Sequence, residues 1–132
     1  MSASVLRLRQ RFLAAGIAGN VVFLVSLILP WFDLGSYDSM SGWTVLPAAW
    51  AIALVCIAAI IGFVAEMNAI VLPLHLAPMR VAAYCSSIPL WFSGAFLVAG
   101  GGTGRSWGLV IAVLGSVIAT VAATRVAPSR RR

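Results

Sequence analysis

The stretch LILPWFDLGSYDSMSGWTVLP, residues 27–47, decides how the chain is threaded. It contains two of the three carboxylates, Asp33 and Asp38, together with Trp31 and Trp43, and long aliphatic runs lie on both sides of it. Asp, Gly and Ser favour turns, and Trp is enriched where a chain crosses the boundary between lipid and water. We therefore expect the chain to leave a membrane within this stretch, turn, and enter the membrane again.

The composition of the whole chain also indicates a membrane protein. Of the 132 residues, 62% are hydrophobic and 9% are charged, against about 45–50% and about 25% in a soluble domain. So few charges cannot cover a water-exposed surface. The nine basic residues are all Arg and give a net charge of +6. They lie at the ends of apolar runs and form no basic stripe, so we do not expect nucleic-acid binding.

Four apolar runs are long enough to cross a bilayer as helices, which takes about 20 residues each. Backbone groups have no water partner in lipid, and these runs do not alternate as barrel strands do, so helices are predicted. The expected spans are residues 12–32, 45–65, 81–99 and 106–124, with outer loops at 33–44 and 100–105 and an inner loop at 66–80. The predicted fold class is an all-α integral membrane protein, with residues 1–132 forming a single four-helix transmembrane bundle.

The Arg residues predict the orientation of the bundle. All but one lie on the side of the two termini, at Arg7, Arg9, Arg11, Arg80, Arg125, Arg130, Arg131 and Arg132, whereas Arg105 lies on the other side. The positive-inside bias then places both termini in the cytoplasm. The first span is too long for a cleaved signal peptide and lacks its cleavage site, so we expect it to be retained. The tail Arg130, Arg131 and Arg132 should contact anionic headgroups.

Tryptophans mark the expected outer boundary of the membrane. The rings at Trp31, Trp43, Trp50 and Trp107 are predicted to form an outer aromatic belt. Trp91 is different because it falls within the third span, close to Pro89, which should kink that helix. Its N–H needs a partner there. Trp91 is therefore a candidate contact with a neighbouring helix or another protein.

A small set of neutral polar residues falls within the spans. We expect an interhelical polar seam made by Asn20, Ser86, Ser87, Ser116 and Thr120. The seam has two interpretations: hydrogen bonds that join helices, or a small polar pocket. The first, which includes hydroxyls bonded back to their own helix, is favoured. Small residues four apart, such as Ala15 and Gly19, allow close helix packing within the bundle or in an oligomer.

The sequence contains few residues that could form a catalytic, metal-binding or proton-transfer site. The one histidine, His75, has no second His or Cys near it, and Cys56 and Cys85 read as apolar packing residues. Asp33 and Asp38 lack the further ligands of a cation site. No ionisable residue lies inside a span, as proton-coupled transport would need. We expect no catalytic, cofactor-binding or metal site, and so no enzyme.

An ion pair is possible at the inner loop, which Glu66 and Arg80 bracket. An exposed pair of this kind contributes only about 0–1 kcal/mol. The pair therefore has little predicted effect on stability.

The segments SLILPWF, SGW, WAIALVCIAAIIG and GGTGRSWGLVIAVLGSVIA give the chain a family resemblance. In these segments it resembles a group of small four-span membrane proteins common in actinobacteria. The resemblance covers nearly the whole chain, and it implies the four-span topology and a bacterial plasma membrane while bringing no catalytic residue. We expect an accessory or scaffold subunit that contacts lipid and a membrane-protein partner or further copies of itself. The alternative is an oligomeric small transporter or channel component.

Overall fold

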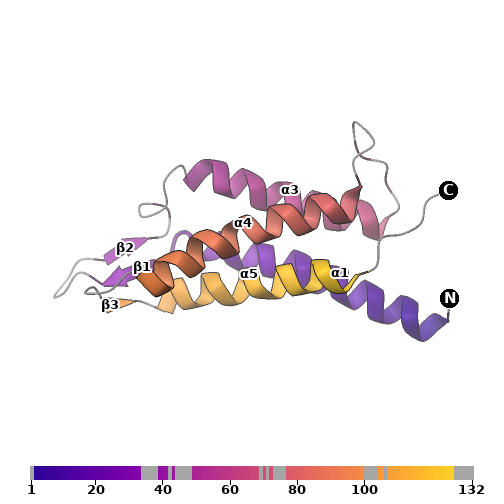
Figure 1. Cartoon of the computed structure of the whole chain (residues 1–132), viewed down its shortest axis with the longest axis horizontal. Helices are drawn as coiled ribbons and strands as arrows, with labels where there is room; N and C mark the ends of the chain where they lie inside the picture. The colour runs from indigo at the N-terminus through magenta and orange to yellow at the C-terminus, as the bar shows by residue number, and fades with distance from the viewer. Residues whose placement is uncertain are drawn as a thin grey trace.

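A computed structural model of the chain describes residues 2–33, 39–41, 43, 49–68, 70, 72, 77–99, 104–105 and 107–126. Within this part, four helices are long and apolar enough to cross a membrane. They are α1 (Ala3–Ser26), α3 (Ala49–Met67), α4 (Pro78–Ala99) and α5 (Trp107–Arg125), packed as an all-α bundle (Figure 1). The predicted four-helix bundle is confirmed, and the chain is a small four-span membrane protein.

Helix α1 begins well before the first expected span. Ser2 is its N-cap, and the Ser2 hydroxyl accepts a hydrogen bond of 3.4 Å from the backbone N–H of Val5. This bond satisfies one of the free amides that every helix start exposes. The N-terminal Arg residues therefore lie on the same continuous helix as the membrane span, and in Figure 1 this part of α1 projects beyond the other helices.

Three short strands follow the helices at one end; two lie in the expected outer loops, whereas the first takes up the last residues of the first expected span. They are β1 (Pro30–Asp33), β2 (Ser39–Ser41) and β3 (Gly104–Arg105), in the antiparallel order β2-β1-β3. Strand pairing satisfies backbone groups where the chain leaves the helices. A backbone hydrogen bond of 2.8 Å from Trp43 to the carbonyl of Leu27 ties the same region to the end of α1. We call this end of the bundle the sheet end, and the opposite end, where α1 begins and α5 ends, the terminal end (Figure 1).

The interior has two apolar clusters, one toward each end of the bundle. The cluster toward the sheet end consists of Phe23, Leu27, Trp31, Ala49, Ile52, Cys56, Leu109 and Ala112. The cluster toward the terminal end consists of Leu13, Phe63, Met79, Ala82, Ala123 and Val126. Along α1 and α5, the buried Asn20 and Ser116 lie between members of the two clusters, and on α4 the buried Ser86 and Ser93 lie between Ala82 and Phe96, which packs against the sheet-end cluster.

Glycines allow the helix backbones to touch inside the bundle. A Cβ added at Gly19 on α1 would lie 2.5 Å from the carbonyl oxygen of Gly115 and 2.8 Å from the amide of Ala119. One added at Gly62 on α3 would lie 2.8 Å from the carbonyl oxygen of Pro78. These small residues therefore serve packing within the bundle, which is one of the two roles that the sequence left open.

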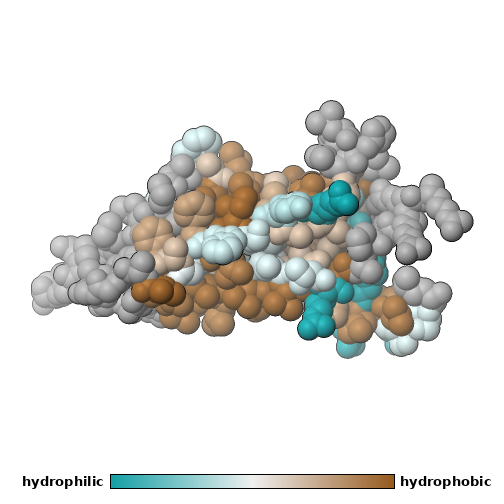
Figure 2. All heavy atoms as spheres, viewed as in Figure 1, coloured by the Kyte–Doolittle hydropathy of each residue, from teal (hydrophilic) through white to brown (hydrophobic). Residues whose placement is uncertain are grey.

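The outer surface of the helices is largely apolar. Figure 2 shows hydrophobic residues over the middle of the bundle and hydrophilic residues gathered toward the terminal end. Exposed aliphatic side chains include Leu54 on α3 and Leu114 on α5, each 56% exposed. A surface of this kind fits a hydrocarbon environment.

Candidate functional site

A layer of polar side chains, the polar layer, connects three helices in the middle of the bundle. The amide nitrogen of Asn20 on α1 donates hydrogen bonds to Ser86 Oγ on α4 at 3.2 Å and to the carbonyl of Gly16 at 3.0 Å. The hydroxyl of Thr120 on α5 has one proton, which is shared between the carbonyl of Ser116 at 2.8 Å and the carbonyl of Ser86 at 3.2 Å. Ser86 therefore joins α4 to both α1 and α5.

Ser93 and Ser116 bring α4 and α5 close together beside the polar layer. Their hydroxyl oxygens lie 3.4 Å apart, and both residues are buried. Each hydroxyl has one proton, which Ser93 donates to the carbonyl of Pro89 at 2.7 Å and Ser116 to the carbonyl of Ala112 at 2.9 Å, so this is a close polar contact between helices while the stronger bonds stay within each helix. Ser93 was not among the expected seam residues. Its spacing could have identified it, because it follows Ser86 by seven residues and so lies on the same helix face.

Ser87 does not join the polar layer. Its hydroxyl donates to the carbonyl of Tyr84 on the same helix at 2.7 Å. Consecutive residues on a helix point about 100° apart. Because Ser86 faces the interior, Ser87 points to the outer side of α4. The structure thus brings together Asn20, Ser86, Ser116 and Thr120, and leaves Ser87 apart.

Pro89 lies within α4 and is fully buried. Proline removes one backbone donor from a helix interior. Helix α4 nevertheless runs from Pro78 through Ala99, and the bond that Ser93 makes to the Pro89 carbonyl lies in this same turn.

The predicted belt tryptophans differ in their surroundings. Trp43 and Trp50 are 51% and 64% exposed. Trp31, which the sequence places in the belt, is instead fully buried: its Nε1 donates to the carbonyl of Ser26 at 2.8 Å, and its ring packs edge-on against Phe23. Strand β1 packs against α5, and Trp31 at its start lies in the apolar cluster toward the sheet end, between Phe23 and Phe96, which accounts for this burial. The side chain of Trp107 and residues 130–132 lie outside the described part of the chain.

A buried ion pair connects α1 and α3 toward the terminal end. The guanidinium of Arg9 contacts the carboxylate of Glu66, whose side chain is 2% exposed, while that of Arg9 is 18% exposed. The sequence suggested Arg80, which is exposed on α4, as a partner of Glu66, and the structure shows Arg9 as a partner that the sequence did not suggest. Arg9 precedes the buried Leu13 by four residues, so both lie on one face of α1. This pairing was missed because the first span was expected to begin at residue 12.

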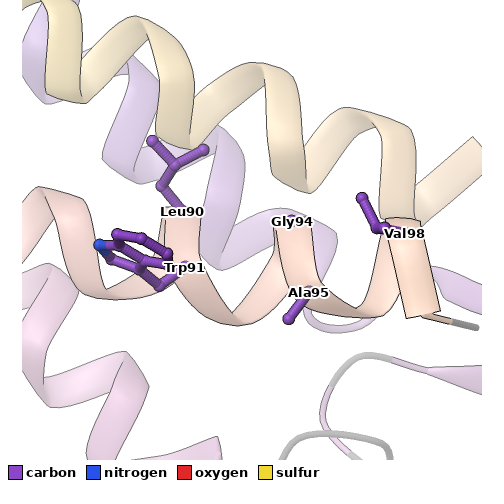
Figure 3. Close-up of a pocket in the computed structure, with 5 residues that line it drawn as sticks. All are labelled: Leu90, Trp91, Gly94, Ala95 and Val98. Atoms are coloured by element: carbon purple, nitrogen blue, oxygen red, sulfur yellow. The ribbon is translucent and has the colours of Figure 1, made fainter.

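Helix α4 carries an apolar hollow on its outer face. The hollow has a volume of about 450 Å³ and is lined by Leu90, Trp91, Gly94, Ala95 and Val98 (Figure 3). Trp91 is 77% exposed and Val98 is 82% exposed. A Cβ added at Gly94 would meet no atom within 4 Å. Trp91, the candidate contact residue, therefore forms part of an open surface.

The described residues hold no group of three or more His, Cys, Asp or Glu placed to bind a metal ion. Cys56 is a buried free thiol and Cys85 a half-buried one. His75 and Asp38, neither of which the sequence assigned to a metal site, lie outside the described residues.

We predict a measurable coupling between Asn20 and Ser86. A double-mutant cycle with Asn20→Ala and Ser86→Ala should give a coupling energy of about 0.6 kcal/mol and at most about 2 kcal/mol, as interhelical hydrogen bonds in membranes do. Unfolding of the purified protein by SDS in mixed micelles would measure it. The matched control is Ser87→Ala with Asn20→Ala, which should show no coupling. If the effects of Asn20→Ala and Ser86→Ala are additive, this hydrogen bond does not contribute to the stability of the bundle.

The polar layer can hold helices together through neutral hydrogen bonds. In the described part of the chain, every buried side-chain nitrogen or oxygen has a hydrogen-bond partner. The outer face of α4 offers a different chemistry, namely apolar contact around Trp91. Comparison with protein-family models, curated proteins and solved structures finds no match for this chain.

Proposed function

We propose that the protein is a non-catalytic accessory or scaffold subunit that packs against a larger membrane complex. The observation that carries this proposal is the use made of the polar groups inside the bundle. Asn20, Ser86 and Thr120 are engaged in bonds between helices. These three polar residues inside the bundle therefore contribute to holding its helices together.

The outer surface supports the same proposal. Trp91 exposes most of its ring at the level of the polar layer, between Ser86 and Ser93 along α4. Within the described part of the chain, no acceptor lies within hydrogen-bonding distance of its indole N–H. A polar group without a partner is costly in hydrocarbon. Contact of α4 with another polypeptide would supply both cover for the ring and an acceptor.

We also propose that the termini are cytoplasmic and that the membrane is the plasma membrane of a bacterium. The exposed Arg7, Arg11, Arg80 and Arg125 lie on the helix ends at the terminal end. This distribution supports a cytoplasmic terminal end through the positive-inside bias. The resemblance to small actinobacterial membrane proteins supports the bacterial location.

The test of the accessory role is purification from the native membrane. The tagged chain, made at its natural level, is extracted in a mild detergent, and proteins that co-elute in fixed ratio are identified by mass spectrometry. An unrelated four-span protein with the same tag is the control. We expect at least one larger membrane protein in constant stoichiometry. A pure homo-oligomer that conducts ions in liposomes would instead establish the transporter or channel role.

A further inference from the structure

Two exposed arginines, Arg11 on α1 and Arg125 on α5, lie near the terminal end of the bundle. The two helices run in opposite directions and cross where Gly19 packs against Gly115 and Ala119. Arg11 precedes Gly19 by eight residues, and Arg125 follows the midpoint of Gly115 and Ala119 by eight residues. At 1.5 Å per residue, each arginine is about 12 Å from the crossing. The two arginines therefore lie at the same depth on neighbouring helices.

Both arginines also border the contact between α1 and α5. Arg11 precedes Val22 by eleven residues, which is about three helical turns, so the two share a stripe of α1. Val22 packs against α5, because a Cβ added at Gly115 would lie 2.9 Å from its Cγ1. On α5, Arg125 follows the buried Ala122 by three residues, and Ala122 follows Gly115 by seven, on the face that contacts α1.

The polar layer shows that both arginines are on the outer side of this contact. Asn20 and Thr120 bond to Ser86 on α4 and so mark the inner faces of α1 and α5. At 100° per residue, Arg11 lies about 180° around α1 from Asn20. Arg125 lies about 140° around α5 from Thr120. The two arginines thus border the same lipid-facing side of the α1–α5 contact.

Neither arginine is paired with a carboxylate in the described part of the chain. The carboxylates described there are Asp33, in β1 at the sheet end, and Glu66, which Arg9 contacts. Packed helices lie about 8–10 Å apart, so two long side chains at one depth can reach an anion between them. Guanidinium groups match the oxygens of a phosphate group with two hydrogen bonds each.

An apolar surface continues from the two arginines toward the middle of the bundle. Leu114, Ile118 and Val121 precede Arg125 by eleven, seven and four residues and so lie on its stripe of α5. They are 56%, 48% and 47% exposed, and Val22 on α1 is 37% exposed. Figure 2 shows the same order over the whole bundle, with hydrophobic residues in the middle and hydrophilic residues toward the terminal end. Cationic groups beside an apolar surface match a phospholipid, in which a phosphate adjoins acyl chains.

We propose that Arg11 and Arg125 together bind the phosphate of one anionic phospholipid, whose acyl chain lies along Val22 and Ile118. The ligand is a lipid because the apolar surface begins directly beside the arginines. It is anionic because Arg7, also exposed, lies one turn beyond Arg11 on the same face of α1 and repels the ammonium group of a zwitterionic headgroup. The site requires only a bilayer and so goes beyond the accessory role.

Native mass spectrometry of the purified full chain in detergent tests this site. Dioctanoyl phosphatidylglycerol is titrated into each variant, and the fraction of chains that carry one lipid gives an apparent dissociation constant. We expect Arg11→Gln and Arg125→Gln each to raise this constant by about fivefold, from the contribution of one arginine near a membrane surface. Arg80→Gln removes an exposed arginine from α4 and is the matched control, which should leave the constant unchanged.

Three results would overturn the proposal. Equal weakening by Arg80→Gln would show a general attraction of the terminal end for anions. Equally tight binding of dioctanoyl phosphatidylcholine would exclude recognition of an anionic lipid. Displacement of the lipid by inorganic phosphate at the same concentration would show that the acyl chain contributes nothing. Circular dichroism of each variant checks that the helices are retained.

Discussion

Gly19→Leu is expected to destabilise the bundle by about 3 kcal/mol or more, at the upper end of the cost of overpacking. The Cβ alone would lie 2.5 Å from the carbonyl oxygen of Gly115 and 2.8 Å from the amide nitrogen of Ala119. Both atoms belong to the backbone of α5, so neither can move aside by changing a rotamer. The helices must separate, and movement of α1 also strains the hydrogen bond from the adjacent Asn20 to Ser86 on α4.

The adjacent residue provides the control for this prediction. Ala18 is exposed on the same helix, so Ala18→Leu adds a similar volume where no helix packs. It should change the free energy of unfolding by no more than about 0.5 kcal/mol. Unfolding by SDS, followed by circular dichroism, compares the two variants. Equal stability of Gly19→Leu and Ala18→Leu would mean that α1 and α5 do not cross at Gly19.

The four spans could be predicted from the sequence because a helix that crosses a bilayer needs about 20 consecutive, mainly apolar residues. Runs of this length and polarity are visible in the sequence itself. The residues at which the helices and strands begin and end depend instead on helix capping and on pairing between distant segments. Helix α1 starts at Ala3 because a helix continues into water wherever its N-terminus can be capped, as Ser2 does here. Strand β1 depends on pairing with segments far along the chain, such as Gly104–Arg105, which local sequence patterns do not reveal.

The polar layer, too, could be predicted from the sequence only in part. Asn20 and Ser86 were identifiable as polar residues at matching depths, and the structure places them in contact. Depth alone could not exclude Ser87, because the direction of a side chain depends on how α4 is rotated in the bundle. The sequence placed Trp31 in the outer aromatic belt because of its residue type. Its burial depends instead on the path of the chain after α1.

Replacing Arg9 with methionine should lower the free energy of unfolding by about 3–5 kcal/mol, the usual cost of removing one partner from a buried ion pair. The Glu66 side chain is 2% exposed, and the variant removes the guanidinium that contacts its carboxylate. The carboxylate then loses a favourable interaction that water reaches too poorly to replace. Because the pair is buried, the effect should change little between low and high salt.

Three further variants separate the ion pair from a general effect of arginine. Arg7→Met and Arg11→Met remove exposed arginines from the same helix and should cost no more than about 0.5 kcal/mol each. Arg9→Met combined with Glu66→Gln removes both charges of the pair while keeping the shape of the Glu66 side chain. This double variant should therefore be more stable than Arg9→Met alone. If the double variant is instead the less stable of the two, Glu66 contributes mainly through other contacts, and the loss in Arg9→Met reflects the packing of the arginine stem along α3.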